Sequence, residues 1–249
     1  MIKVEQVEQI ADGRHVARHI DIVVVVLHRI GQVITAAIAY PVLGNHEFQR
    51  CEESACLENW WATFPQLRGR RWYSVALGSR LRVFALDRDA SLLAGSEQAT
   101  SLEQQFQRLD PGVAFVLILL HHPPFTDAPQ ESRANEQALA TYLASVARQS
   151  SSIQLIVCAA HVHNYERFEH DGLLYLVSGG GGAKPSAIAR SAADRYQDLR
   201  FPNFHYLRLE LDGERLTGEM HRLTDFNAAA PGAWAINDRF ELSATLSRR

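Results

Sequence analysis

Three clusters of metal-ligand side chains dominate the chemistry that this sequence could perform. They are Gly44-Asn45-His46-Glu47, His121-His122-Pro123-Pro124 and His161-Val162-His163-Asn164-Tyr165-Glu166-Arg167. Each cluster follows a stretch typical of a β-strand, and hydrolytic metal sites commonly take their ligands from loops at strand ends. One cluster alone would be weak support, whereas three in series are hard to explain by packing. The sequence therefore predicts a hydrolytic metal centre.

The histidines of the second and third clusters have the spacing of metal ligands. His161 and His163 are two residues apart, so in extended backbone both imidazoles project from the same side of the chain. Neutral imidazoles bind zinc, iron and manganese ions. His121 ends an apolar run and precedes two prolines that stiffen the exit from the strand. His122 should point the opposite way, toward a substrate or into a structural role.

The first cluster offers an oxygen ligand and a proton donor. Asn45 carries an amide oxygen that suits a hard cation, and Gly44 lets the backbone turn tightly before it. The alternative for Asn45 is a turn residue that bonds its own backbone. His46 follows directly, and its imidazole is placed to donate a proton to a leaving group.

Composition excludes several other classes of protein. The 249 residues are 47% hydrophobic, which is enough for one domain with a substantial core, and we expect a single domain over residues 1–249. The net charge is −3 without a run of Lys and Arg, so no nucleic-acid clamp is evident. The three cysteines form no Cys-x-x-Cys pair, and Cys51 and Cys56 can pair only across a local turn.

The sequence gives no targeting segment. Residues 1–13 are polar and mixed in charge, so we expect no signal peptide. The apolar stretch from Ile22 to Leu43 is interrupted by His28 and Arg29, which makes it a poor membrane span. The localisation is unknown, with a cytoplasmic protein as the default and no membrane among its partners.

Helices and strands are expected to alternate early in the chain and to pair as hairpins later. The spacing of Val4 to Ala11 predicts a helix, Ile22 to Leu27 predicts a buried strand, and Gly31 to Ala39 is ambiguous but tolerates a helix. Further strands are expected at residues 40–43, 72–77, 81–86, 113–120, 153–158, 173–177, 204–211 and 215–221, and helices at 96–109 and 135–148. This order predicts an α/β layer architecture with a mixed sheet.

Several motifs together carry a resemblance to a known family. Besides the three clusters they are Pro41-Val42-Leu43, Trp72-Tyr73-Ser74, Ala85-Leu86-Asp87, Gly95-Ser96-Glu97-Gln98 and Ser178 to Gly182. From Tyr40 to His221 the chain resembles the calcineurin-like metallophosphoesterases, in the branch similar to purple acid phosphatases. The resemblance implies a four-layer αββα metallophosphatase fold, in which two mixed sheets pack face to face and are flanked by helices.

The resemblance also implies an activity and a set of roles. Members hydrolyse phosphoric esters by attack of metal-activated water on phosphorus. By position, Asn45, His121 and His161 resemble ligands of the second metal, and His163 resembles a ligand of the first. His46 resembles the residue that contacts the phosphate or protonates the leaving oxygen. The substrate side is expected to include His122, Gly180 and Gly181. The implied cofactors are one or two divalent or trivalent ions, with iron, zinc or manganese favoured.

The chain departs from this family at its N-terminus. The aspartate motifs expected there are lacking. The chain starts at what reads as the first helix, so the family's first strand is missing on this interpretation. Residues 1–39 are therefore expected to be atypical or truncated. Leu27-His28 stands where a Gly-Asp pair would supply a bridging carboxylate, which makes His28 a candidate substitute ligand. Neutral ligands leave the charge of the metals uncompensated, so we expect the second metal position to be better preserved.

Two functions follow from these departures. The first is a phosphoesterase weakened by the missing carboxylates, and the alternative is a non-catalytic or truncated family member that keeps the fold and binds metal or phosphate. Relatives are often exported, although this chain shows no export signal. The open edge left by a missing strand favours a homodimer through the N-terminal edge. Residues 225–249 are expected to be a C-terminal tail with a loop over Asp225 to Trp234.

Overall fold

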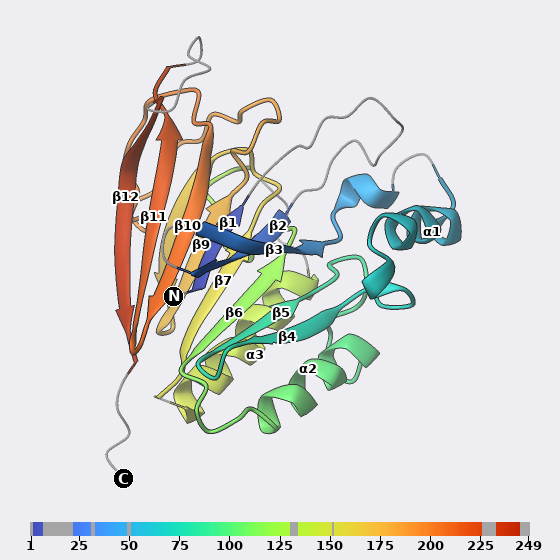
Figure 1. The fold of residues 1–249 in the computed structure, drawn as a ribbon. Coiled ribbons are helices and arrows are strands. Elements are labelled where there is room, and N and C mark those ends of the chain that lie inside the picture. Colours follow the sequence, from blue (N-terminus) through green and yellow to red (C-terminus); the bar gives the residue numbers. More distant parts are fainter. Residues whose placement is uncertain are drawn as a thin grey trace.

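Two six-stranded sheets pack face to face in the computed structural model (Figure 1). The structure describes residues 2–6, 22–30, 33–48, 51–129, 134–150, 152–225 and 233–244, with side chains from residue 39 onward. The first sheet has the order β12-β11-β10-β1-β2-β3, and the second has the order β4-β5-β6-β7-β9-β8. The expected α/β class with two packed sheets is confirmed.

The first sheet is antiparallel in all its pairings, and we refer to it as the antiparallel sheet. Its strands are β1 (Ile2–Gln6), β2 (Ile22–Ile30), β3 (Val33–Val42), β10 (His205–Asp212), β11 (Arg215–Leu223) and β12 (Trp234–Ser243). Along β10, buried Leu207 and Leu209 alternate with half-buried Tyr206 and Arg208. This alternation is typical of a sheet with one face on the core and one toward solvent.

The second sheet combines parallel and antiparallel pairs and is called the mixed sheet here. Its strands are β4 (Tyr73–Leu77), β5 (Leu81–Ala85), β6 (Phe115–Leu120), β7 (Gln154–Ala159), β8 (Tyr165–His170) and β9 (Leu173–Ser178). Every residue of β6 is buried, because both faces of the sheet are covered. One face packs on the antiparallel sheet, and the other packs on α2 (Glu97–Gln107) and α3 (Ala134–Gln149) (Figure 1).

Ion pairs on the outer face of the antiparallel sheet explain why this face can be exposed to solvent. Glu219 lies 3.2 Å from Arg208 and 2.6 Å from Arg239, measured between carboxylate oxygens and guanidinium nitrogens. A face lined by such polar side chains does not require a covering layer. Within the described part of the chain, no helix covers this face, and the helices lie against the mixed sheet (Figure 1).

Several elements follow the sequence prediction closely. The β4–β5 hairpin turns at the expected Gly78-Ser79, and α2 begins after Ser96, whose Oγ accepts a hydrogen bond from the backbone N–H of Ala99. A serine at this position satisfies one of the unpaired N–H groups of the first helical turn. These local patterns were sufficient because the turn and the cap depend on adjacent residues alone.

The helix predicted at the N-terminus is wrong, and the segment left ambiguous after residue 31 is a strand. Residues 2–6 form β1, between β10 and β2, where a helix was expected. Residues 33–42 form β3, where the sequence tolerated a helix up to Ala39. Pairing with neighbouring strands overrides weak helical spacing, because strand propensity depends on context. The expected helical positions Val7, Ile10 and Ala11 lie outside the described residues.

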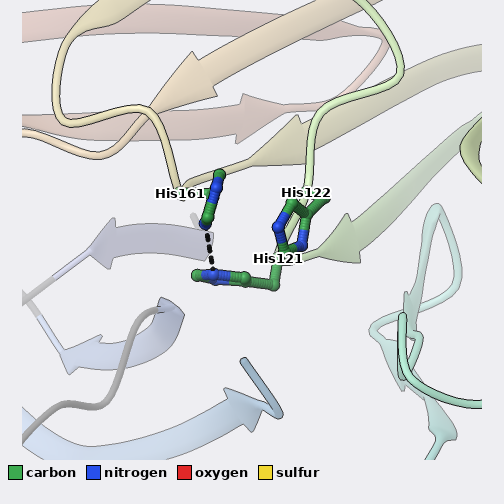
Figure 2. Close-up of side chains that lie close together, drawn as sticks. All are labelled: His121, His122 and His161. Atoms are coloured by element: carbon green, nitrogen blue, oxygen red, sulfur yellow. Dashed lines mark hydrogen bonds between the residues drawn. The ribbon is translucent and has the colours of Figure 1, made fainter. Parts of the chain in front are cut away.

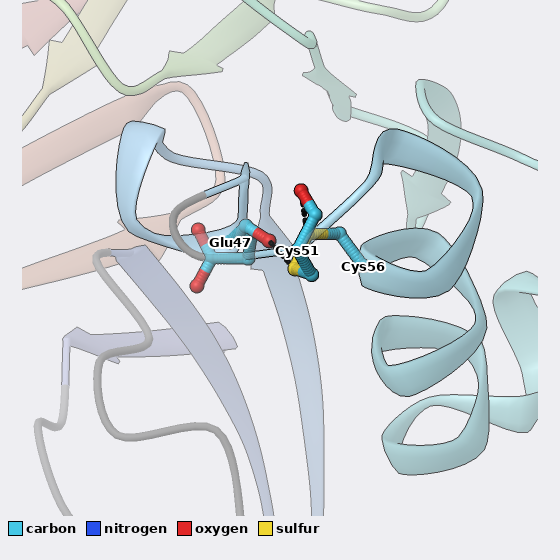
Figure 3. Close-up of a disulfide and its surroundings, with 3 residues drawn as sticks. All are labelled: Glu47, Cys51 and Cys56. Carbon is cyan, nitrogen blue, oxygen red and sulfur yellow. Dashed lines mark hydrogen bonds between the residues drawn. A yellow bond between two sulfur atoms is a disulfide. The ribbon is translucent and has the colours of Figure 1, made fainter.

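A disulfide and a small helix hold the end of β3. Cys51 and Cys56 are joined across the expected local turn, with their Cα atoms 5.7 Å apart, between the 3₁₀ helix η1 (Asn45–Phe48) and α1 (Glu53–Thr63) (Figure 3). Trp60 of α1 is buried against Leu43. A second 3₁₀ helix, η2 (Pro65–Leu67), follows α1. The sequence analysis had assigned no helix to this region.

Two further strands were not expected. β8 carries charged residues that obscure its strand pattern, and β12 lies inside the region expected to be a C-terminal tail. The expected loop over residues 225–234 falls largely outside the described residues. Among the described residues, no helix is long and apolar enough to cross a membrane.

Three carboxylates hold the connections that follow the histidine clusters. Glu166 on β8 accepts hydrogen bonds from the Thr126 hydroxyl at 2.7 Å and the Asp127 N–H at 2.6 Å. Asp127 in turn accepts the Ser191 N–H at 2.6 Å. Asp194 pairs with Arg190 and accepts a backbone N–H from β8 at 3.0 Å. Burial and the neighbouring carboxylates Asp194 and Asp127 raise the pKa of Glu166 to about 7.

We predict that Glu166→Gln removes a pH dependence of stability. A carboxyl group whose pKa is raised on folding contributes stability that is fully present below its ordinary pKa, and this stability is lost as pH rises through the folded pKa. The free energy of unfolding of the natural chain should therefore fall, relative to the variant, by up to about 3 kcal/mol between pH 4.5 and 7. Urea unfolding across this range measures the difference.

Glu169→Gln is the matched control, because Glu169 lies on the same strand with an exposed carboxylate. Histidine titrations are common to all three proteins and cancel in the comparison. A difference between the natural chain and Glu166→Gln that stays constant from pH 4.5 to 7 would contradict the assignment.

The N-terminal edge at which a homodimer was expected is β3, the last strand of the antiparallel sheet among the described residues. We predict that the chain dimerises through this edge, and that Ala39→Lys on β3 shifts it to a monomer by placing a charge at the pairing edge. Size-exclusion chromatography with light scattering measures the mass. Ala235→Lys on β12, the opposite edge, is the matched control. A natural chain that is a thermally robust monomer would refute the prediction.

Candidate metal centre

The histidine clusters meet where strands of both sheets end. Asn45 opens η1 directly after β3, His121 follows β6, and His161 lies two residues beyond the end of β7. The parallel strands β6 and β7 end side by side, and the Ala160 N–H donates to the His121 carbonyl at 3.0 Å. The carboxyl ends of parallel strands are the usual place for a binding site in such sheets.

Three ligand atoms converge on one point. His121 Nε2 lies 2.7 Å from Asn45 Oδ1 and 2.9 Å from His161 Nδ1 (Figure 2 draws the contact between the two histidines). An amide oxygen only accepts hydrogen bonds, so His121 Nε2 must be the donor to Asn45. The same proton also faces the lone pair of His161 Nδ1, so two acceptors, Asn45 Oδ1 and His161 Nδ1, lie around a single N–H of His121. A cation at this point would bind all three.

His161 reaches the site through an unusual backbone conformation. Its φ is +61°, in the left-handed region that costs a residue with a side chain roughly 1–2 kcal/mol. The expectation of extended backbone from His161 to His163 is therefore wrong, since the chain bends between β7 and β8. Strain at a ligand position is common at functional sites.

His122 does not point away from His121. Its ring centroid lies 3.7 Å from that of His161 and 4.7 Å from that of His121 (Figure 2). The expected opposite orientation rests on strand alternation, which does not continue because β6 ends at Leu120. His121, His122 and His161 each bring a ring nitrogen within 4.8 Å of the others.

Burial keeps these imidazoles neutral. It is the largest cause of the lowered pKa values of all three, about 3 for His122 and about 4 for His161, with the pKa of His121 lowered further. The charge of Arg88 and of neighbouring imidazoles adds to the effect. Neutral imidazole is the form that binds a metal.

The other expected ligands lie around this group. The Nδ1 of His163 donates to the Lys184 carbonyl at 2.8 Å, which leaves Nε2 as its lone-pair atom, an arrangement frequent among metal-bound histidines. His163 is not in the group within 4.8 Å. His46 in η1 is half-buried and lies close enough to lower the pKa values of His121 and His161 electrostatically.

His28 does not lie at a strand end. β2 continues past it to Ile30, and its backbone pairs with Ala36 of β3. The strand is longer than expected because its pairing with β3 continues through Arg29 and Ile30. The side chain of His28 lies outside what the structure describes, and its role as a substitute ligand stays a prediction.

Close packing accounts for glycine at two positions of the Gly179 to Gly182 turn. A Cβ at Gly179 would lie 2.2 Å from the Val162 carbonyl oxygen, and one at Gly180 would lie 2.1 Å from the His205 ring. Gly180 is buried, whereas Gly181 is exposed. The turn therefore holds the backbone around His163, and the substrate-side roles of Gly180 and Gly181 remain predictions.

Sequence motifs did not single out Arg88, Asp127 or Asp194, and Glu166 was noted only as part of the third cluster, without a role. Arg88 follows β5, the strand beside β6, and pairs with Asp89 at 2.6 Å. The sequence signal that could have identified Arg88 was its position directly after the motif Ala85-Leu86-Asp87. The three carboxylates also bring oxygens within 4.8 Å of one another. Their hydrogen bonds to loop N–H and hydroxyl groups mark them as a structural junction.

The residues at the histidine group fit a transition metal. The group offers imidazole nitrogens beside an amide oxygen, and nitrogen-rich sets of this kind suit zinc and related ions. Both ring nitrogens of buried His122 have no hydrogen-bond partner among the described residues. Buried polar groups are rarely left without a partner, and a metal bond would supply one.

No protein-family model matches the chain, and no curated protein matches it. Solved structures do. GAP50, the anchor in the inner membrane complex of Plasmodium, is 11% identical, with a TM-score of 0.52 over 71% of this chain and 56% of that one. At this identity the likeness shows a shared fold and nothing of the activity.

Two weaker likenesses are to Vps29 and to a predicted phosphoesterase. Vps29 of Chaetomium thermophilum is 14% identical over 71% of this chain and 62% of its own, with a TM-score of 0.33. The Streptococcus pneumoniae phosphoesterase is 13% identical over 81% and 68%, with a TM-score of 0.30. This chain thus spans less than two thirds of GAP50 and of this Vps29, and scores below 0.5 support no argument about the site.

Proposed function

We propose that this chain is a metal-dependent phosphoric ester hydrolase, of the branch similar to purple acid phosphatases, with its metal at the ends of β3, β6 and β7. The observation that supports the proposal is the convergence of Asn45 Oδ1, His121 Nε2 and His161 Nδ1. These are the three residues that the motif resemblance assigns to one metal. Phosphate esters follow as the substrate class from that resemblance.

The protein side chains have distinct tasks in this proposal. A bound ion of the zinc, iron or manganese type supplies Lewis-acid activation of water and of a phosphoryl oxygen. Asn45, His121 and His161 hold and orient that ion. Arg88 contributes positive potential at the group, part of which its ion pair with Asp89 offsets. His46, adjacent to Asn45, protonates the leaving oxygen.

A second candidate function is a non-catalytic protein that keeps the metal site. The observation in its favour is that the histidine group contains no carboxylate among the described residues. Neutral ligands do not offset the charge of a divalent ion, and a bridging carboxylate is what holds two ions together in related sites. Metal binding without turnover would establish this second function.

We predict that His161→Ala removes both metal and activity. The natural chain, loaded with zinc or manganese, should hydrolyse p-nitrophenyl phosphate or bis(p-nitrophenyl) phosphate. The variant should lose at least about 100-fold in kcat/KM, because loss of a direct ligand costs no less than loss of an outer-shell partner. Elemental analysis and initial rates measure the two effects.

His221→Ala is the control for this experiment. His221 lies on the outer face of the antiparallel sheet, stacked on Tyr206 with ring centroids 4.7 Å apart, and should leave metal content and rate unchanged. Activity that survives His161→Ala would refute the site. A natural chain that binds metal but hydrolyses neither ester supports the non-catalytic function.

We also predict that Asn45→Asp tightens metal binding. The substitution keeps the shape of the side chain and adds a negative charge, which the neutral ligand set lacks. Affinity for Zn²⁺ should rise about tenfold, equivalent to about 1.4 kcal/mol of added attraction. Competition with a chelating dye measures the change, and equal or weaker binding would show that Asn45 does not contact the ion.

A further inference from the structure

The environment of His122 is not explained by either role expected for it. The side chain is 3% exposed, so it is not presented to bulk solvent as a substrate contact would be. A purely structural histidine normally hydrogen-bonds both of its polar atoms, yet neither ring nitrogen of His122 has a partner among the described residues. Its ring instead lies against His161, tilted by 35° (Figure 2).

We propose that His122 is a metal ligand, so that His121, His122 and His161 together form a three-imidazole centre. This inference rests on the metal binding proposed above and not on the hydrolytic activity. It assigns to His122 a role that the motif resemblance does not, since there His122 was placed on the substrate side.

The spacing of the three rings suits one ion. In a tetrahedral zinc site with Zn–N bonds of 2.0–2.1 Å, ligand nitrogens lie about 3.3 Å apart. The nitrogens of the group lie within 4.8 Å of one another, and the closest measured pair, His121 Nε2 and His161 Nδ1, is 2.9 Å apart. The three nitrogens are therefore close enough to share one ion after side-chain adjustment.

Two neighbouring strands hold these rings in place before a metal binds. His121 and His122 follow β6 directly, and Pro123 and Pro124 restrict the chain after them. His161 is held by the Ala160–His121 backbone hydrogen bond. Ligands fixed in this way lose little conformational entropy when the ion binds.

The three-imidazole centre leaves His163 outside. His163 is half-buried, is tied to the Lys184 carbonyl and is not in the group. The metal then has three imidazoles, with Asn45 or a substrate oxygen in the fourth position, as in catalytic zinc sites. Three neutral nitrogen ligands favour Zn²⁺ over harder ions such as Mg²⁺. We therefore infer a site for one zinc-type ion.

The first test compares zinc affinity in two variants of the full chain. His122→Phe keeps an aromatic ring against His161 and removes both nitrogens, so it should lower zinc affinity at least tenfold. His163→Ala should change the affinity less than threefold. His221→Phe, the same exchange on a histidine stacked on Tyr206, is the matched control and should bind as the natural chain does. Competition with a chromogenic chelator on metal-free protein gives the affinities.

A second measurement avoids dependence on the folding of His122→Phe. X-ray absorption at the zinc edge counts imidazole ligands, and the zinc-loaded His163→Ala variant should show three. A count of two would overturn the inference, because it would mean that His121 and His161 bind the ion and His122 does not.

The outcomes separate this inference from the proposed function. Unchanged zinc affinity in His122→Phe, with loss in His163→Ala, would overturn the role of His122 and leave the proposed hydrolase intact. A natural chain that binds no zinc and no manganese would overturn both. Loss of zinc in His122→Phe with three imidazoles in His163→Ala supports the three-imidazole centre whether or not ester hydrolysis is found.

Discussion

The contact of His121 Nε2 with Asn45 and His161 is the interaction on which the site depends. It joins the two sheets, because Asn45 follows β3 of the antiparallel sheet while the two histidines follow β6 and β7 of the mixed sheet. The fully buried β6 fixes where His121 lies. The Cys51–Cys56 disulfide and the packing of Trp60 on Leu43 hold the segment that carries Asn45. The geometry of the site thus follows from how the sheets pack.

Charge is the second constraint on the site. Buried imidazoles next to Arg88 are neutral, since burial and neighbouring positive charge both lower their pKa values. The site can accept a cation through lone pairs but does not offset its charge with a carboxylate among the described residues. The carboxylate of Glu166 does not belong to the histidine group, because it accepts hydrogen bonds from the Thr126 hydroxyl and the Asp127 N–H. Such a site favours a single ion that prefers nitrogen ligands.

Local patterns predicted the parts of the fold that depend on adjacent residues. The cap at Ser96 and the placement of His121 at a strand end were confirmed, since each depends on a short pattern of apolar and polar residues. The order of elements was enough to predict an α/β architecture with a mixed sheet, whereas the two packed sheets were expected only from the motif resemblance. The strand at residues 33–42 and the direction of His122 could not be predicted, because the first depends on partner strands and the second on where β6 stops. The assembly of Asp127 with Glu166 and Asp194 requires tertiary structure.

Anomalous diffraction from crystals grown with zinc tests the central claim most directly. The account predicts one strong zinc peak, about 2.0–2.1 Å from His121 Nε2 and from a ring nitrogen of His161. The absence of a peak at this position in zinc-saturated crystals, or a single peak among Asp127, Glu166 and Asp194, would contradict it.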